Sequence, residues 1–228
     1  MQGITIIAIG GGGFTDQTWP ALDAFCLTQT GKAKPHLGYI GAASQDDPRR
    51  IARFHDRFEG LSASHIHLPM TLDAQTLADQ LSQLDMVYVG GGNTEAMVAQ
   101  WRDTGWDRVL CEAANAGLLL AGVSAGAVCW FEQFLFNDGT GPIRPLRGLG
   151  LIKGGACPHY STETDRRAAL HRAVADQTMP TTHAIDDGVA VLFNADGPIR
   201  LCTAEPGASA YHIIRDAHGQ THETTLSL

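Results

Sequence analysis

The sequence predicts an α/β fold in which helices cover both faces of a mostly parallel sheet, giving three layers. Apolar runs alternate with helical stretches at the spacing of βαβ units. Residues 86–89 (Met-Val-Tyr-Val) are apolar throughout, which is typical of parallel strands buried on both faces. The 228 residues are 44% hydrophobic and 18% charged, which is enough for one full core. We therefore expect a single domain over residues 1–228.

The first half of the chain is expected to supply most of this sheet. Strands are predicted at residues 5–9, 36–40, 65–68, 86–89 and 118–121. Helices are predicted at residues 18–30, 48–59, 74–84 and 94–115. The last helix is expected to break near Thr104 and Gly105, because glycine interrupts helices.

The pattern changes after Gly148. One more helix is predicted at residues 163–176, and shorter segments follow at residues 182–185, 189–193, 199–202 and 210–215. These segments have the length of strands and are expected to be partly antiparallel additions. The chain contains no internal repeat, low-complexity tract or linker, so they belong in the same domain.

Composition narrows the partners and the location. The net charge of -8 argues against nucleic acid or an anionic membrane as a partner. No apolar run has the length of a membrane span, and the first residues lack the basic region of a secretion signal. We therefore expect a cytoplasmic protein. The five cysteines include no C-x-x-C pair, which favours buried thiols over disulfides or a thiolate metal site.

A nucleophilic serine is indicated by the segment at residues 122–126 (Gly-Val-Ser-Ala-Gly). A buried strand before it and a helix after it give the context of a nucleophile elbow. Serine at such a turn has strained backbone angles, and small residues two positions before and after it leave room for the turn. The turn also aims the N–H groups after Ser124 at one point, where a developing anion would be stabilised. Glycines around a serine often form an ordinary tight turn, but this context favours a nucleophile.

A cluster of four glycines follows the first predicted strand, at residues 10–13. No frame of it gives G-x-G-x-x-G, because Thr15 or Asp16 stands where the third glycine belongs, so a dinucleotide site is poorly supported. We expect instead a close approach of the backbone to the sheet edge or to the active site.

A second cluster, Gly-Gly-Gly at residues 90–92, opens a helix that Asn93 or Thr94 is suited to cap. A phosphate cradle would require a lysine after the glycines, and none is present there. Loops at the carboxyl ends of parallel strands meet at one edge of the sheet. Free N–H groups of Gly91 or Gly92 are therefore expected to share an oxyanion with the N–H of Ala125.

The serine needs a base and a third group that orients the base. Among ten histidines, His159 follows two glycines in a segment with little helical character, and catalytic side chains often lie in loops on a rigid scaffold. Other histidines fall in predicted strands or in the polar C-terminal region, where catalysis is less expected: His65, His67, His212, His218 and His222. Asp138, Asp186 and Asp187 are the acid candidates, and the residue pattern alone does not choose among them.

Three motifs in this order and spacing resemble the peptidase E (aspartyl dipeptidase) family, which includes cyanophycinase. They are Val-Gly-Gly-Gly-Asn-Thr at residues 89–94, Ala-Gly-Val-Ser-Ala-Gly-Ala at residues 121–127 and Cys-Pro-His-Tyr at residues 157–160. The similarity extends from about residue 4 to residue 211. It implies a flavodoxin-like three-layer sandwich related to class I glutamine amidotransferases, and an enzyme without a metal or other cofactor.

The resemblance also implies roles for individual residues. Ser124 matches the nucleophile and His159 the base of a Ser-His-Glu or Ser-His-Asp triad. The acid of peptidase E precedes a glycine in a late turn, and Asp187 occupies that place. A second aspartate of the family matches Asp138.

The departure from the family concerns the substrate. The arginine that binds a substrate aspartate in peptidase E would fall at Asp165, and Arg166 is one residue away. We assign Asn93, Asp165 and Arg166 to substrate binding, and expect a small peptide or amide substrate that is hydrolysed by dipeptidase-like or aminopeptidase-like chemistry. We expect no nucleic acid or membrane partner, and a monomer or homodimer.

Other functions remain open on the sequence. An α/β-hydrolase esterase uses the same elbow but places its acid before a late histidine, an order that only Asp187 with His212, His218 or His222 would meet. A glutamine amidotransferase is less favoured, since it would carry cysteine in place of Ser124. A catalytically silent ligand-binding protein would leave that serine unreactive toward a fluorophosphonate probe.

Overall fold

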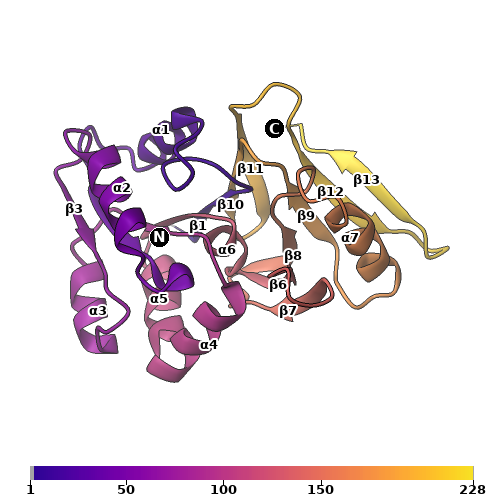
Figure 1. Ribbon diagram of the computed structural model, residues 1–228, viewed down its shortest axis with the longest axis horizontal. Helices are drawn as coiled ribbons and strands as arrows, with labels where there is room; N and C mark the ends of the chain where they lie inside the picture. The colour runs from indigo at the N-terminus through magenta and orange to yellow at the C-terminus, as the bar shows by residue number, and fades with distance from the viewer. Residues whose placement is uncertain (1–2, 228) are drawn as a thin grey trace.

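The computed structural model describes residues 3–227 and contains two β-sheets with helices around them (Figure 1). The first sheet has seven strands in the order β11-β10-β1-β5-β4-β2-β3. Its strands are β1 (Thr5–Ile9), β2 (His36–Ile40), β3 (Ser64–His67), β4 (Met86–Val89), β5 (Leu119–Val123), β10 (Val189–Asn194) and β11 (Gly197–Thr203). The five strands from β1 to β5 pair in parallel, whereas β10 and β11 are antiparallel additions at one side.

Helices cover both faces of the first sheet, because alternate side chains of its strands are apolar on each face. Ile7 and Ile9 of β1 pack with residues of α1 (Pro20–Gln29) and α2 (Pro48–Phe58). Ile6 and Ala8 pack on the other face, in a cluster that includes residues of α3 (Ala74–Leu81), α4 (Thr94–Thr104) and α5 (Trp106–Asn115). This arrangement confirms the three-layer prediction for the first part of the chain.

The second sheet has six strands in the order β13-β12-β9-β8-β6-β7. Its strands are β6 (Phe131–Phe136), β7 (Arg144–Arg147), β8 (Ile152–Cys157), β9 (Thr182–Ile185), β12 (Ala210–Arg215) and β13 (Thr221–Thr225). One side of this sheet shares a hydrophobic cluster with the first sheet, through residues such as Phe134 and Ala156. The other side is covered by α7 (Arg166–Ala175), through Leu170 and Val174.

The structure confirms most predicted elements of the first sheet and the four strands predicted after residue 180, and it adds β6, β7, β8 and β13, which were not predicted. The helix break at Thr104 and Gly105 is confirmed, since α4 ends at Thr104 and α5 begins at Trp106. The later strands do not all extend the first sheet, because six of them form a sheet of their own. Gly154 and Gly155, expected in a turn before His159, lie within β8.

No helix within residues 3–227 is long and apolar enough to cross a membrane.

Candidate active site

The turn between β5 and the short helix α6 (Ala125–Val128) holds Ser124 at φ 55° and ψ −110°. This backbone conformation is strained for a residue with a side chain. Gly122 and Gly126 make the turn possible, because a Cβ on Gly122 would lie 2.3 Å from the Gly126 carbonyl oxygen and a Cβ on Gly126 would lie 2.1 Å from that of Val89. The Ser124 N–H donates to the Ile9 carbonyl at 3.0 Å, so the turn is attached to the end of β1.

His159 connects Ser124 to an acid. Its Nε2 lies 2.8 Å from Ser124 Oγ, and its Nδ1 lies 2.6 Å from Asp187 Oδ1. His159 follows β8 and Asp187 follows β9, and these strands are parallel neighbours. Their carboxyl ends therefore bring the two side chains together, beside the end of β5 where Ser124 lies. The hydrogen bonds place His159 between a nucleophile and an acid, as a serine hydrolase requires.

The Asp187 carboxylate is held in its charged form. Burial acts to raise its pKa, but hydrogen bonds from His159 and Thr162, together with the nearby charges of His159 and Arg166, outweigh burial and lower it below the ordinary aspartate value. Thr162 Oγ1 donates to Asp187 Oδ2 at 2.9 Å, so both carboxylate oxygens have a partner. Thr162 was not predicted from the sequence, since no motif marks a hydroxyl three residues after the histidine.

The first glycine cluster lies directly against this pair. A Cβ on Gly11 would be 2.1 Å from Asp187 Oδ1 and 2.9 Å from His159 Nδ1. The Gly188 N–H donates to the Gly11 carbonyl at 3.0 Å. The cluster thus permits a close approach of the backbone to the site, which confirms the structural interpretation that we preferred to a dinucleotide loop.

The second glycine cluster borders Ser124 from β4. A Cβ on Gly91 would be 3.2 Å from Ser124 Cβ, so this residue lies beside the nucleophile. Neither Gly91 nor Gly92 donates its N–H to another residue in the described part of the chain. Ala125 begins α6, and the first N–H groups of a helix have no intrahelical partner. The N–H groups of Gly91, Gly92 and Ala125 are therefore available to an anion beside Ser124. Asn93 caps α4 by accepting from the Ala96 N–H at 2.9 Å, as predicted.

Asp138 is not brought to His159. Its carboxylate is exposed and accepts from the N–H and hydroxyl of Thr140, at 3.0 and 2.7 Å. It therefore stabilises the turn between β6 and β7, and the carboxylate in contact with the imidazole is that of Asp187.

The residues expected at the substrate position lie around the start of α7. Asp165 is exposed and precedes the helix without capping it. Arg166 is 4% exposed and donates to Glu163 Oε2 at 2.7 and 3.0 Å and to the Leu135 carbonyl at 3.2 Å. Arg167 pairs with Glu223. The guanidinium of Arg166 is therefore engaged by Glu163 and the Leu135 carbonyl inside the protein.

Two of the other late histidines have partners away from Asp187. His212 stacks on His183 with ring centroids 4.9 Å apart, and His222 pairs with Asp216 at 2.7 Å. Within residues 3–227, the histidine that Asp187 contacts is His159 and not one of these later histidines. The arrangement that an α/β-hydrolase esterase requires is therefore not formed there. No group of three or more His, Cys, Asp or Glu in the same range is arranged to hold a metal ion.

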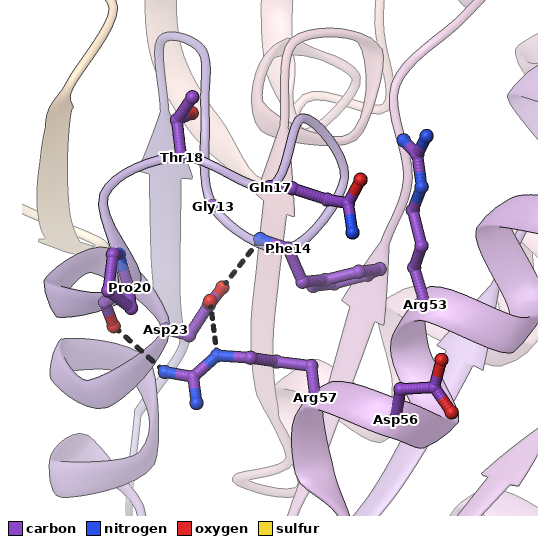
Figure 2. Close-up of a pocket in the computed structure, with 9 residues that line it drawn as sticks. All are labelled: Gly13, Phe14, Gln17, Thr18, Pro20, Asp23, Arg53, Asp56 and Arg57. Carbon is purple, nitrogen blue, oxygen red and sulfur yellow. Dashed lines mark hydrogen bonds and ion pairs between the residues drawn. The ribbon is translucent and has the colours of Figure 1, made fainter.

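A cavity of about 300 Å³ lies beside the loop after β1, between this loop and α2 (Figure 2). Asp23 accepts from Arg57 Nε at 2.8 Å and from the Phe14 N–H at 3.2 Å, and Arg57 also donates to the Pro20 carbonyl. Ser124, His159 and Asp187 do not line this cavity. The Asp23 contact fixes the backbone at Phe14, directly after the first glycine cluster.

Residues 6–201 match the family model of peptidase family S51. The chain belongs to this family. This match confirms the family resemblance that the three motifs indicated. The protein is therefore a serine peptidase of family S51. It is similar to the peptidase YgaJ of Bacillus subtilis (strain 168), with 36% identity over 215 residues that cover 93% of each chain. It is also similar to the cyanophycinase of Synechococcus elongatus, with 24% identity over 86% of this chain and 64% of the relative.

The fold of this S51 peptidase is shared with a solved relative. A crystal structure of a peptidase from an acI-B1 Actinobacterium superposes with a TM-score of 0.70 at 18% identity, covering 100% of this chain and 98% of the other. The likeness supports the predicted α/β fold.

Proposed function

We propose that the protein is a dipeptidase-like or aminopeptidase-like serine peptidase that hydrolyses small peptides or amides through an acyl-enzyme. The observation that carries this proposal is the chain of hydrogen bonds from Ser124 through His159 to Asp187. Family membership supplies the reaction class, and the contacts supply the roles of the individual residues.

In the first step, His159 Nε2 accepts the proton of the Ser124 hydroxyl while Oγ attacks the substrate carbonyl carbon. Asp187 holds the imidazole through Nδ1 and stabilises the cation that forms. The carbonyl oxygen becomes an oxyanion, which the N–H of Ala125 and that of Gly91 or Gly92 receive. Each such donor contributes roughly 3 to 4 kcal/mol to the barrier reduction.

The tetrahedral intermediate then collapses. The C–N bond breaks, and the imidazolium gives its proton to the leaving amine. A water molecule, deprotonated by His159, attacks the Ser124 ester and releases the acid. The serine hydroxyl recovers its proton from the same imidazole, so protons and bonds balance over the cycle.

The side-chain preference follows from the start of α7. Asp165 presents a carboxylate where an aspartate-specific member would have an arginine, and an acidic substrate would be repelled there. Arg166 and Arg167 are both paired with glutamates. We therefore expect weak or no cleavage of Asp-X dipeptides, and, if Asp165 faces the bound substrate, a preference for neutral or basic residues at that position.

The test is the variant Ser124→Ala, assayed with a dipeptide library and with a fluorophosphonate probe. Alanine fits the turn, so circular dichroism should be unchanged while hydrolysis and labelling are lost. Labelling at the wild-type level would place the nucleophile elsewhere. Turnover of Asp-Leu, Leu-Leu and Lys-Leu by the wild type and by Asp165→Arg tests the preference, and robust wild-type cleavage of Asp-Leu would contradict it.

A further inference from the structure

The peptide between Gly91 and Gly92 needs an external support. The ends of its loop are fixed by backbone hydrogen bonds, from the Gly90 N–H to the Ile40 carbonyl at 3.0 Å and from the Asn93 N–H to the Ala43 carbonyl at 2.8 Å. The peptide in the middle joins two glycines, which resist rotation less than any other pair of residues. A rotated peptide would point its carbonyl where its N–H had been, and a carbonyl repels an oxyanion.

Arg50 of α2 supplies the support. Its Nη1 donates to the Gly91 carbonyl oxygen at 2.7 Å. This is a charge-assisted hydrogen bond, the stronger kind in proteins. Because the C=O and N–H of a trans peptide point in opposite directions, holding the Gly91 carbonyl toward Arg50 keeps the Gly92 N–H directed away from it.

Arg50 is also close to the reacting serine. The Cβ position built on Gly91 lies 3.8 Å from Arg50 Nη1 and 3.2 Å from Ser124 Cβ. Arg50 Nη1 therefore lies no farther from Ser124 Cβ than the sum of these two distances. Arg50 is partly buried, whereas the side chain of its neighbour Arg49 is 85% exposed and pairs with Asp47.

We infer that Arg50 is a positioning residue for the oxyanion hole, which it assembles by fixing the Gly91–Gly92 peptide. The inference rests on the function proposed above, and adds a residue that lies outside the three motifs. Two further arginines on the same face of α2 also donate to backbone carbonyls, those of residues that follow the first glycine cluster. Arg53 donates to the Thr15 carbonyl at 2.6 Å, and Arg57 to the Pro20 carbonyl (Figure 2).

The experiment measures the rate of Ser124 labelling by a fluorophosphonate as a function of pH, which requires no knowledge of the natural substrate. Oγ forms a bond to phosphorus, fluoride leaves, and the serine proton passes to His159, while the P=O oxygen occupies the oxyanion hole. In Arg50→Met, the plateau rate of labelling should fall by about 10- to 100-fold. This loss is no larger than the one expected when an oxyanion-hole donor is removed altogether. The pH midpoint and the thermal unfolding midpoint should be unchanged. Arg50→Lys, which can still donate to one carbonyl, should recover part of the rate, and Arg49→Met should match the wild type.

Each other outcome decides against the inference in a distinguishable way. An unchanged plateau in Arg50→Met, with normal labelling of the wild type, would overturn the role of Arg50 alone. A lower plateau with a shifted pH midpoint would mean that the arginine acts through the charge state of His159. A lower plateau with a lower unfolding midpoint in both Arg50→Met and Arg50→Lys would mean that it only supports the fold. If the wild type neither labels nor hydrolyses any dipeptide, the proposed function fails and this inference falls with it.

Discussion

Each carboxylate oxygen of Asp187 has a partner: Oδ1 contacts His159 Nδ1, and Oδ2 accepts from Thr162 Oγ1. The Thr162 contact orients the carboxylate toward the imidazole. We expect Asp187→Asn to lower kcat by about four orders of magnitude, because the amide would favour the wrong tautomer of His159. His159→Ala should cost as much as Ser124→Ala, since members of a triad act as a unit. Steady-state kinetics on the best dipeptide would measure both effects. Asp138→Asn is the matched control, and a larger loss there than in Asp187→Asn would exchange the two assignments.

The burial of His183 predicts that the stability of the protein depends on pH. Burial, reinforced by the neighbouring His212, lowers the pKa of His183 from 6.5 to about 4. Between these pH values the unfolded chain binds a proton that the folded protein does not, so the folded state loses stability as the pH falls from about 6.5 to about 4. The loss from this group is on the order of 3 kcal/mol. Urea unfolding at several pH values should show it.

Two histidine variants, one at the buried position and one at an exposed position, test this prediction. His183→Gln should flatten the pH dependence in that window, because glutamine does not titrate. His218→Gln, which changes an exposed side chain, should leave the slope as in the wild type. Equal slopes in the wild type and in His183→Gln would show that other groups set the acid sensitivity.

At the residue scale, the sequence was sufficient for groups that belong to a local pattern and insufficient for those that do not. Ser124 and His159 lie in motifs with a defined backbone context. Thr162 and Arg50 act through contacts with residues 25 and 41 positions away, and such pairings depend on how distant strands meet. The residue pattern alone did not choose between Asp187 and Asp138. The family resemblance favoured Asp187, and the contact of His159 Nδ1 with Asp187 Oδ1 agrees with that choice.

The elbow illustrates how packing limits an element. A Cβ on Gly126 would lie 2.1 Å from the Val89 carbonyl oxygen, which belongs to the backbone of β4 and cannot move alone. We expect Gly126→Ala to lower the free energy of unfolding by about 1 to 3 kcal/mol and to displace α6 from Ser124, so that labelling is also lost. Gly141→Ala, where nothing lies within 4 Å, is the control for denaturant unfolding and labelling. Wild-type stability in Gly126→Ala would show that the turn is looser than described.

Elements with a strong local signal were predicted, and those without one were missed. The parallel strands β1, β2 and β4 are short apolar runs between clear helices, and their bounds were predicted without error. Only two residues separate α6 from β6, and both are apolar like the start of the strand. No glycine, proline or polar residue marks the change from helix to strand. β8 contains two glycines and β13 is polar; both are strands because of pairing with neighbours, and propensity gives little sign of either.

On the scale of the whole molecule, the two sheets share their largest hydrophobic cluster. We propose that residues 1–228 act as one domain and expect a single cooperative unfolding transition. Trp101 and Trp130 are buried in this cluster with ring centroids 5.7 Å apart, and their fluorescence reports on it, while far-UV circular dichroism reports on both sheets. The two denaturation curves should coincide. Two separate transitions would divide the chain into two folding units.

The turn at residues 139–141 between β6 and β7 is exposed, and it separates the nucleophile from the base and acid along the chain. Ser124 lies before it, whereas His159 and Asp187 lie after it. A polypeptide opened at this turn would yield one piece that carries the serine and another that carries the groups that activate it. β1 pairs with β10, and β6 pairs with β8. Each piece therefore holds one strand of each pair, and these pairings would bring the two pieces together. The protein is therefore a natural template for a split reporter, in which serine reactivity signals that two fused partners have met.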